Sequence, residues 1–131
     1  MASLKRSKQR EAILKYLEGT KCHPTADMVY DRIRQEQPNI SLGTVYRNLS
    51  LLTDQGIIQK ISIPGQPDRF DFRTDNHPHL TCAECGCVID LDIDLPDLKT
   101  IADEAYDGEI TGHQTFFFGL CPECLKKIRE S

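Results

Sequence analysis

The chain has no apolar segment long enough to cross a membrane, and its first residues lead into charged sequence without the apolar core of a secretion signal. It also has no internal repeat and no low-complexity segment. These absences favour a cytoplasmic protein that does not use a membrane as a partner. A chain of 131 residues can build one hydrophobic core or two small ones.

Charge is distributed unevenly along the chain, which an overall net charge of −4 conceals. Residues 1–63 carry ten Lys and Arg against six Asp and Glu, a net charge of +4. Residues 64–131 carry six against fourteen, a net charge of −8. A basic half suits a polyanion such as DNA, and an acidic half suits hard cations or serves solubility. A solvated surface gives the same imbalance, so charge alone does not decide the function.

Two cysteine pairs share one spacing, Cys82 with Cys85 and Cys121 with Cys124. Each Cys-x-x-Cys turn lets two sulfurs reach one ion, and two such turns provide a closed tetrahedral shell for a structural Zn(II). Two disulfides are the alternative reading, which a reducing cytosol disfavours.

Cys22 and Cys87 lie outside the two pairs. We interpret them as small, partly buried side chains. Cys87 is near enough to Cys85 in sequence to compete as a zinc ligand.

The first half of the chain predicts three helices followed by a β-hairpin. Hydroxyl caps and Gly or Pro breakers delimit the helices, which run from Ser7 to Gly19, from Thr25 to Pro38 and from Ser41 to Gly56. The hairpin joins residues 57–63 to 69–72 through a Pro-Gly turn. Three helices followed by such a hairpin describe a winged helix-turn-helix, whose third helix enters the major groove.

The second half predicts a hinge and a small α/β unit. Strands are expected near 80–82, 88–93 and 111–120, with a helix capped by Asp94, with Pro96 in its first turn and Ile101 inside. So small a sheet with surplus aromatic surface suggests a homodimer. The predicted fold class is therefore α+β, with a winged-helix domain at 1–72, a hinge at 73–78 and a dimerisation domain at 79–131.

A second candidate metal site centres on His77 and His79. Residues two apart in extended backbone project from the same face, so these imidazoles can share an ion. The carboxylates of Asp71 and Asp90 are close in sequence, and His23 lies in the N-terminal domain. Taken singly, each of these residues also has an ordinary structural explanation.

In order and spacing, several motifs together resemble the ferric uptake regulator family over essentially the whole chain. They are His23-Pro24-Thr25-Ala26-Asp27, Ser41-Leu42-Gly43-Thr44-Val45-Tyr46-Arg47-Asn48-Leu49, Arg69-Phe70-Asp71-Phe72, His77-Pro78-His79-Leu80-Thr81-Cys82 and the two cysteine pairs. The resemblance implies a homodimeric, metal-dependent transcriptional regulator and not an enzyme. It also implies a winged-helix domain, a hinge and a dimerisation domain often stabilised by zinc.

The resemblance further implies that five residues hold a regulatory metal: His23, Asp71, His77, His79 and Asp90. Imidazoles and carboxylates suit Fe(II) or Mn(II) and can leave a coordination position open. Aspartate at position 71 resembles the peroxide-sensing branch, in which oxidation of a ligand histidine releases DNA, here His23 or His77. His113 lacks the companions of the family's additional site, so we expect it to be structural or exposed.

One ion held by ligands from both domains would act as an orientation switch, because it binds one arrangement of the domains better than the other. The closed dimer would then present two recognition helices to a pseudo-palindromic operator. The polar face expected for the third helix, Thr44, Tyr46, Arg47, Asn48 and Ser50, has the donors and the cation that read base edges and hold phosphates. On the family's pattern the expected DNA contacts are Tyr46, Arg47, Asn48 and Ser50, with Lys8 and Arg10 at phosphates.

Three alternatives remain open from the sequence. The chain can be an iron- or manganese-responsive uptake regulator without peroxide sensing. It can also be a mononuclear non-haem iron enzyme, since histidines and a carboxylate suffice for such a centre. The third alternative is a zinc-ribbon adaptor that binds protein. DNA binding that depends on Fe(II) or Mn(II) separates a regulator from the last two.

Overall fold

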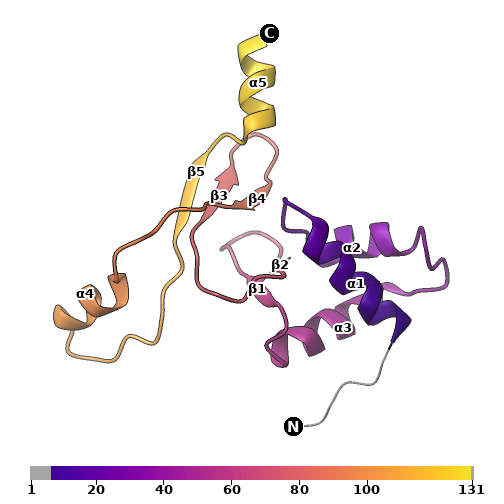
Figure 1. The fold of residues 1–131 in the computed structure, drawn as a ribbon, viewed down its shortest axis with the longest axis horizontal. Coiled ribbons are helices and arrows are strands. Elements are labelled where there is room, and N and C mark those ends of the chain that lie inside the picture. Colours follow the sequence, from indigo (N-terminus) through magenta and orange to yellow (C-terminus); the bar gives the residue numbers. More distant parts are fainter. Residues whose placement is uncertain (1–6, 131) are drawn as a thin grey trace. The chain divides into compact units, whose positions relative to one another are not determined.

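A computed structural model describes residues 7–130 and divides the chain into two compact units, Met1–Thr74 and Asp75–Ser131 (Figure 1). The division falls inside the segment predicted as a hinge, 73–78. The first six residues of the predicted N-terminal domain lie outside the described residues. The two units are described separately below.

Three helices form the N-terminal unit: α1 (Lys8–Gly19), α2 (Ala26–Ile33) and α3 (Leu42–Asp54). Each helix follows a hydroxyl side chain that accepts a backbone N–H from its first turn. These caps are Ser7, Thr25 and Ser41, the three residues that the sequence predicts. Thr25 Oγ1 accepts from Met28 N at 3.3 Å, and Ser41 Oγ accepts from Thr44 N at 3.1 Å.

The core of this unit is built from the apolar stripes of the three helices. Ile13, Val29, Val45 and Leu49 are fully buried, and further buried residues come from the same helices and from the strands that follow. The stripes recur at three- and four-residue spacing, as an amphipathic helix requires. Burial of these side chains fixes which face of α3 remains open to solvent.

The wing consists of β1 (Gln59–Ile61) and β2 (Arg69–Asp71), which pair antiparallel with Lys60 opposite Phe70. Both strands are shorter than the predicted ones. Strand β2 also joins the loop before α2, because Phe70 N donates to Pro24 O at 3.0 Å. The helices and wing of this unit are those of a winged helix-turn-helix.

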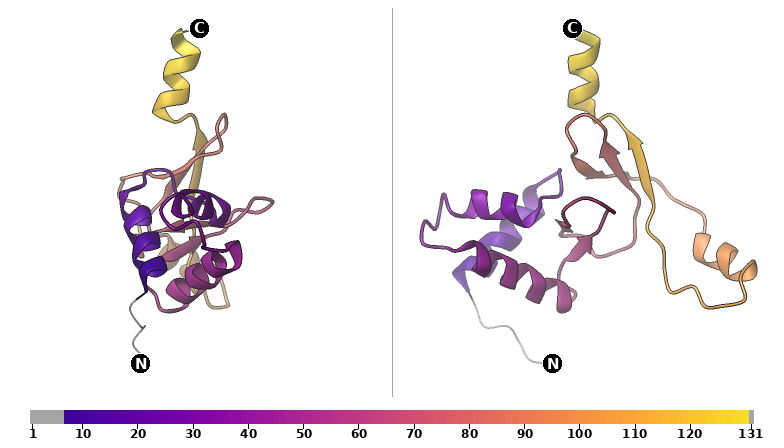
Figure 2. Two further views of the ribbon diagram at one scale, coloured as in Figure 1. Left: turned by 90° about the vertical axis from the view of Figure 1, so that its right-hand side faces the viewer. Right: turned by 180° about the vertical axis from the view of Figure 1, so that it is seen from behind.

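The C-terminal unit contains a three-stranded sheet in the order β4-β3-β5 (Figure 2). Strand β3 (His79–Cys82) pairs antiparallel with β4 (Val88–Asp90) and parallel with β5 (Phe116–Gly119). Helix α4 (Leu98–Glu104) lies between β4 and β5 in the chain, and α5 (Pro122–Glu130) follows β5. None of the described helices is long and apolar enough to span a bilayer.

The start of α4 differs from the prediction. Asp97 and not Asp94 caps the helix, because its carboxylate accepts both Thr100 N at 3.1 Å and Thr100 Oγ1 at 2.8 Å. The Thr100 hydroxyl and backbone N–H lower the pKa of Asp97, since both bonds favour the charged carboxylate. Ile101, expected inside, is 56% exposed, and no residue of α4 is buried.

The third strand also differs from its predicted extent, residues 111–120. Only Phe116–Gly119 form a strand, because β3, against which they pair, is four residues long. Phe118 is 76% exposed and Phe117 39% exposed. The aromatic surface that the sequence predicts to be in excess is therefore open on this unit.

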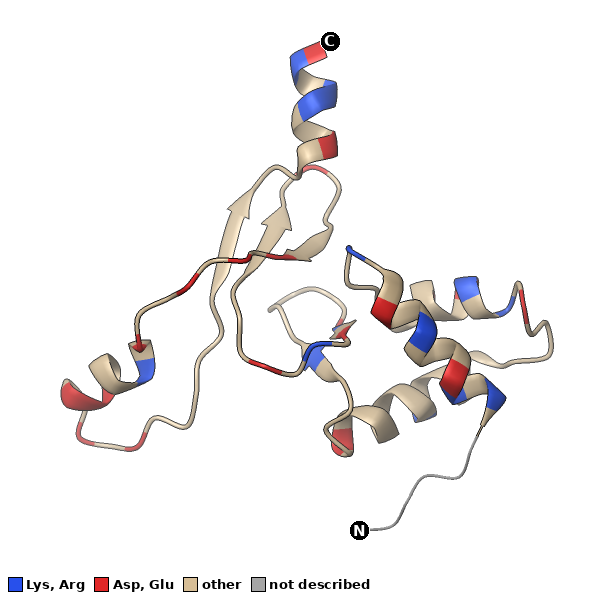
Figure 3. Ribbon diagram, viewed as in Figure 1, with Lys and Arg blue, Asp and Glu red and all other residues tan. Residues whose placement is uncertain are grey.

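Charge follows the two halves of the chain. In the N-terminal unit, Lys and Arg occur on α1 and α2 with acidic residues among them, whereas Asp and Glu predominate on α4 and its flanks (Figure 3). Helix α5 carries Lys127 and Arg129 in its last turn, where cations stabilise the helix dipole.

Candidate metal centres and nucleic-acid interface

The first cysteine pair lies on a tight turn at the end of β3. Gly86 N donates to Cys82 O at 3.0 Å, and Cys82 N donates to Cys87 O at 2.9 Å. Gly86 has φ +76°, a left-handed conformation that L side chains rarely adopt. This turn directs Cys82 and Cys85 to the same side.

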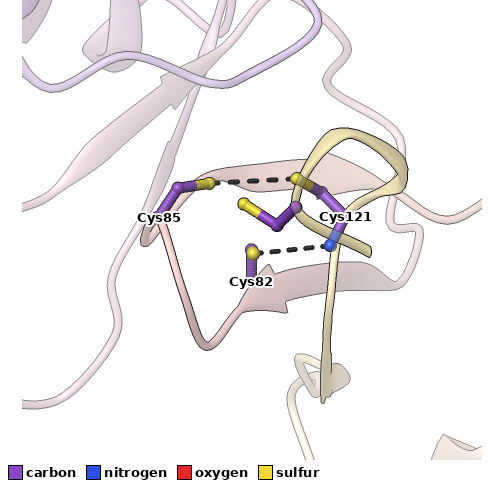
Figure 4. Close-up of side chains that lie close together, drawn as sticks. Cys82, Cys85 and Cys121 are labelled. Atoms are coloured by element: carbon purple, nitrogen blue, oxygen red, sulfur yellow. Dashed lines mark hydrogen bonds between the residues drawn. The ribbon is translucent and has the colours of Figure 1, made fainter. Parts of the chain in front are cut away.

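The second pair lies at the start of α5. Cys121 directly precedes the helix, and Cys124 is in its first turn. Cys121 N donates to Cys82 Sγ at 3.4 Å, and the Sγ atoms of Cys85 and Cys121 are 3.9 Å apart (Figure 4). All four sulfurs lie within 4.8 Å of one another. The structure thus brings together the four cysteines that the sequence pairs, which we call the four-cysteine cluster.

The geometry and protonation of this cluster fit zinc. A tetrahedral ion with Zn–S bonds of about 2.3 Å separates its sulfurs by about 3.8 Å, close to the observed 3.9 Å. The backbone N–H of Cys85, followed by that of Cys121, lowers the pKa of Cys82 to about 6. The side chain of Cys121 and burial raise the pKa of Cys124 to about 12. Four thiolates this close repel one another, so a divalent cation is the partner that lets all four ionise.

Cys87 is partly buried and packs against this cluster without belonging to it. Cys22 lies in the N-terminal unit, where Arg69 Nη1 approaches its Sγ at 3.8 Å. Neither residue is in a group of potential ligands among residues 7–130.

A second group of potential ligands in the C-terminal unit consists of His77, His79 and Asp90. His79 in β3 pairs with Asp90 in β4 across the sheet. Asp90 Oδ1 lies 2.6 Å from His77 Nε2 and 3.4 Å from His79 Nε2. Both histidines are buried, and their ring centroids are 4.5 Å apart. The three side chains converge on one point, as their spacing predicts for the histidines.

The hydrogen bonds of His77 fix its tautomer. Its Nδ1 lies 2.8 Å from Asp75 O, and a carbonyl oxygen only accepts, so Nδ1 carries a proton. In a neutral ring the lone pair of Nε2 then points at the Asp90 carboxylate. Two acceptors 2.6 Å apart repel one another unless a proton lies between them or one cation binds both. An imidazole held by a carbonyl in this way is the usual arrangement of a metal ligand.

The N-terminal unit has its own pair of potential ligands, His23 and Asp71. Both side chains are buried, at 4% and 3% exposure, and His23 Nε2 lies 3.4 Å from Asp71 Oδ2. Asp71 Oδ1 also accepts from Arg73 N at 2.9 Å. A buried carboxylate is costly unless it is paired, so Asp71 is not a solvated strand residue.

Arg69 holds the loop that carries His23, a role that the sequence analysis missed. Its Nη1 donates to His23 O at 2.7 Å. The bond joins the Arg69 side chain to a backbone oxygen 46 positions away in the chain. A hydrophobic pattern cannot reveal such a contact. Its effect is to fix His23 relative to strand β2 and therefore to Asp71.

His113 belongs to neither group of potential ligands in the part of the chain that the structure describes. Its Nδ1 lies 3.3 Å from Thr115 Oγ1, and its carbonyl accepts from Asn76 Nδ2 at 3.2 Å. These contacts fit the structural role expected for it.

The residues predicted to contact DNA differ in their exposure. Tyr46, Arg47 and Ser50 are exposed on α3, and Lys8 is exposed on α1. Arg10 is half-buried. Asn48 is only 7% exposed and lies on the core-facing side of α3, so its placement on the polar face was wrong. The signal was available, because Asn48 lies three residues after Val45 and four before Leu52.

The fold and both ligand groups define a winged-helix protein with a metal-binding C-terminal unit. The model of the "Ferric uptake regulator family" matches residues 1–116, and the chain belongs to this family. The "Peroxide-responsive repressor PerR" of Staphylococcus aureus (strain Mu50) is 37% identical over 127 residues, which are 96% of this chain and 86% of that protein.

Two solved structures extend these similarities. The peroxide stress regulator of Campylobacter jejuni is 31% identical with a TM-score of 0.71, and the match covers 88% of each chain. The ferric uptake regulator of Helicobacter pylori, described with three functional metal-binding sites, is 28% identical with a TM-score of 0.72. That match covers 93% of this chain and 83% of that one. These relatives are named as a repressor and as regulators.

Proposed function

We propose that this chain is a homodimeric, metal-dependent transcriptional repressor whose DNA-binding form is held by one Fe(II) or Mn(II) ion. Its ligands are the side chains of His23, Asp71, His77, His79 and Asp90. The observation that carries the proposal is the pair of acceptors formed by His77 Nε2 and Asp90 Oδ1, 2.6 Å apart, with His79 directed at the same oxygen.

The two ligand groups belong to different units, and this gives the ion its regulatory role. His23 and Asp71 come from the winged-helix unit, and the other three ligands come from the C-terminal unit. Neither group alone completes a shell of five protein ligands. An ion that binds best when both groups surround it favours one orientation of the units, and it can shift their equilibrium only by that difference in affinity.

The two sites are chemically distinct, so one chain can sort two metals. Thiolates prefer Zn(II), and the four-cysteine cluster has no open position for a substrate. Imidazoles and carboxylates suit Fe(II) and Mn(II). We assign the cysteines a structural role and the histidines and aspartates the regulatory one.

DNA binding would use α3 as the recognition helix, with Tyr46, Arg47 and Ser50 on its exposed side and Lys8 and Arg10 at phosphates. The homodimer would present two such helices to a pseudo-palindromic operator. Open aromatic surface on the C-terminal unit, including Phe117 and Phe118, supports dimerisation.

Metal-dependent DNA binding tests this function. An operator would be selected from a random duplex pool with Mn(II)-loaded protein and titrated by fluorescence anisotropy with Fe(II), with Mn(II) and with a chelator that leaves zinc in place. We expect binding with either metal and its loss with the chelator. Arg47→Ala should weaken binding about 10- to 100-fold, the worth of a base contact, with zinc content unchanged.

Arg32→Ala is the matched control for Arg47→Ala. Arg32 is an exposed arginine of α2 that pairs with Glu36, and its loss should leave DNA affinity nearly unchanged. Equal DNA binding with and without the regulatory metal would refute the proposed switch. No DNA binding under any of these conditions would instead favour the zinc-ribbon adaptor.

Peroxide sensing is the finer part of the proposal, and the similarity to peroxide-responsive relatives supports it. Fe(II) held by these ligands would supply the reactivity toward hydrogen peroxide. One peroxide oxygen joins a carbon of a ligand imidazole and the other leaves as water, so histidine loses two electrons and peroxide gains two. The modified ring is a poorer ligand, so the metal and the DNA are released.

Peptide mass spectrometry should find this oxygen after peroxide treatment of iron-loaded protein and not of manganese-loaded protein. Trypsin places His23 in residues 22–32 and His77 in residues 74–99. Tandem spectra must locate the oxygen in the first peptide, because it also contains Met28, which is 39% exposed. Equal histidine oxidation in both metal forms would exclude iron-based sensing. Oxidation in neither form would favour an iron- or manganese-responsive regulator without peroxide sensing.

A further inference from the structure

Asn48 is a polar side chain on the core-facing side of the recognition helix. It lies in one stripe with Val45, Leu49 and Leu52, which are fully buried, and is itself 7% exposed. Burying an amide is costly unless its polar atoms are hydrogen-bonded. Its position therefore needs a partner and leaves it little surface with which to touch DNA.

The partner is Arg10 of α1. Arg10 Nη1 donates to Asn48 Oδ1 at 3.4 Å, a bond that joins residues 38 positions apart. A guanidinium only donates, so the amide oxygen and not its nitrogen faces Arg10. Arg10 lies three residues before Ile13 and seven before Leu17, the buried residues of α1. Helices α1 and α3 therefore contact each other through apolar residues in the core and through this polar pair nearer the start of α1.

A bond of this kind restricts the rotamers of an arginine side chain. An arginine side chain has many rotamers, and its planar fork binds a phosphate well only in the right orientation. The guanidinium has five N–H donors, so a bond to Asn48 is compatible with a phosphate contact. An arginine oriented before binding loses less entropy when the contact forms.

We propose that Asn48 is a positioning residue that orients Arg10 toward a DNA phosphate and does not read a base itself. This inference rests on the proposed DNA-binding function. It assigns Asn48 an effect on affinity that is independent of DNA sequence, because phosphate contacts carry no base information.

A double-mutant cycle on the full-length, metal-loaded protein tests the inference. Wild type, Asn48→Ala, Arg10→Ala and the double variant would be titrated with one 24-base-pair duplex of mixed sequence at several salt concentrations. We expect Arg10→Ala to weaken binding several-fold and to lower the salt slope by about one. Asn48→Ala should reproduce most of both effects. The double variant should bind no more weakly than Arg10→Ala alone.

Asn48→Leu separates positioning from folding, because leucine fills the buried space and removes the bond to Arg10. It should show the same lower salt slope with a thermal midpoint close to that of the wild type. A purely structural role of Asn48 would change the midpoint and leave the salt slope as it was, and that result would overturn the inference.

Two further outcomes would also overturn it. The two substitutions could act additively, so that Asn48→Ala weakens DNA binding of the Arg10→Ala variant by the same factor as it weakens that of the wild type. This result would mean that Asn48 contacts DNA directly. If Arg10→Ala bound DNA with wild-type affinity, Arg10 would not contact DNA, and Asn48 would have no contact to orient. If Arg47→Ala still weakened operator binding, that failure would concern this inference alone; if Arg47→Ala were also without effect, the DNA-binding proposal would fail with it.

Discussion

Replacing Cys124 with serine should abolish zinc binding and unfold the C-terminal unit of the chain. Zinc held by four thiolates contributes on the order of 10–16 kcal/mol, which is as large as the whole free energy of unfolding of a typical domain, about 5–15 kcal/mol. The apolar core of this unit cannot replace that contribution. Buried residues around the cluster are chiefly its own cysteines Cys82, Cys121 and Cys124.

Metal analysis and amide hydrogen exchange measure this outcome together. Zinc should fall from one ion per chain to none, and backbone amides of residues 75–130 should lose protection. Amides of the N-terminal unit should keep theirs, because its core in α1, α2 and α3 contains no cysteine. Glu123→Gln is the matched control, since Glu123 is exposed in the same turn and its substitution leaves all four ligands in place. Full zinc content and unchanged protection in Cys124→Ser would contradict the structural role of the cluster.

Replacing Asp90 with alanine should lower the affinity for the regulatory metal by about 100-fold or more and abolish metal-dependent DNA binding. Changes to groups that only support a metal ligand already cost about 10- to 100-fold, and Asp90 is proposed as a ligand itself. Its Oδ1 is the atom on which His77 and His79 converge, at 2.6 and 3.4 Å. Zinc content should not change, because Asp90 is not part of the four-cysteine cluster.

Asp94→Asn is the control for this variant, since Asp94 is an exposed aspartate four residues further along the chain. Manganese affinity can be measured by calorimetry and compared with operator binding in the same preparation. Asp71→Asn extends the experiment to the other unit. If one ion joins the two groups, Asp71→Asn and Asp90→Ala must both weaken manganese binding. Normal affinity in Asp71→Asn would mean that the C-terminal group binds metal alone and that the ion does not couple the units.

Much of the fold could be predicted because its signals are local. Ser7, Thr25 and Ser41 cap the three helices as expected, since a cap depends on residues within one turn. The cysteine pairs were equally predictable, because the two-residue gap in each pair brings its sulfurs together whatever surrounds them. The start of α4 was less predictable, because Asp94 and Asp97 can both cap a helix. Only the bonds to Thr100 make Asp97 the cap.

The candidate site of histidines and aspartates could be predicted from the sequence only in part. His77 and His79 share a face of extended backbone, and strand alternation alone predicts this. Their convergence with Asp90 required the register of β3 and β4, which places His79 opposite Asp90. The burial of His23 and Asp71 likewise depends on the contact between β2 and the loop before α2.

By itself, then, the amino-acid sequence determined where the three helices of the winged-helix unit begin, which cysteines pair as candidate zinc ligands and which residue types could bind a metal. Each of these depends on neighbours a few positions away or on side-chain chemistry. The tertiary structure alone decided that Asn48 faces Arg10 and the core, that Arg69 holds His23, and that Asp90 meets two imidazoles. These contacts join residues from 11 to 46 positions apart along the chain, and packing and strand register, which no local pattern encodes, bring them together.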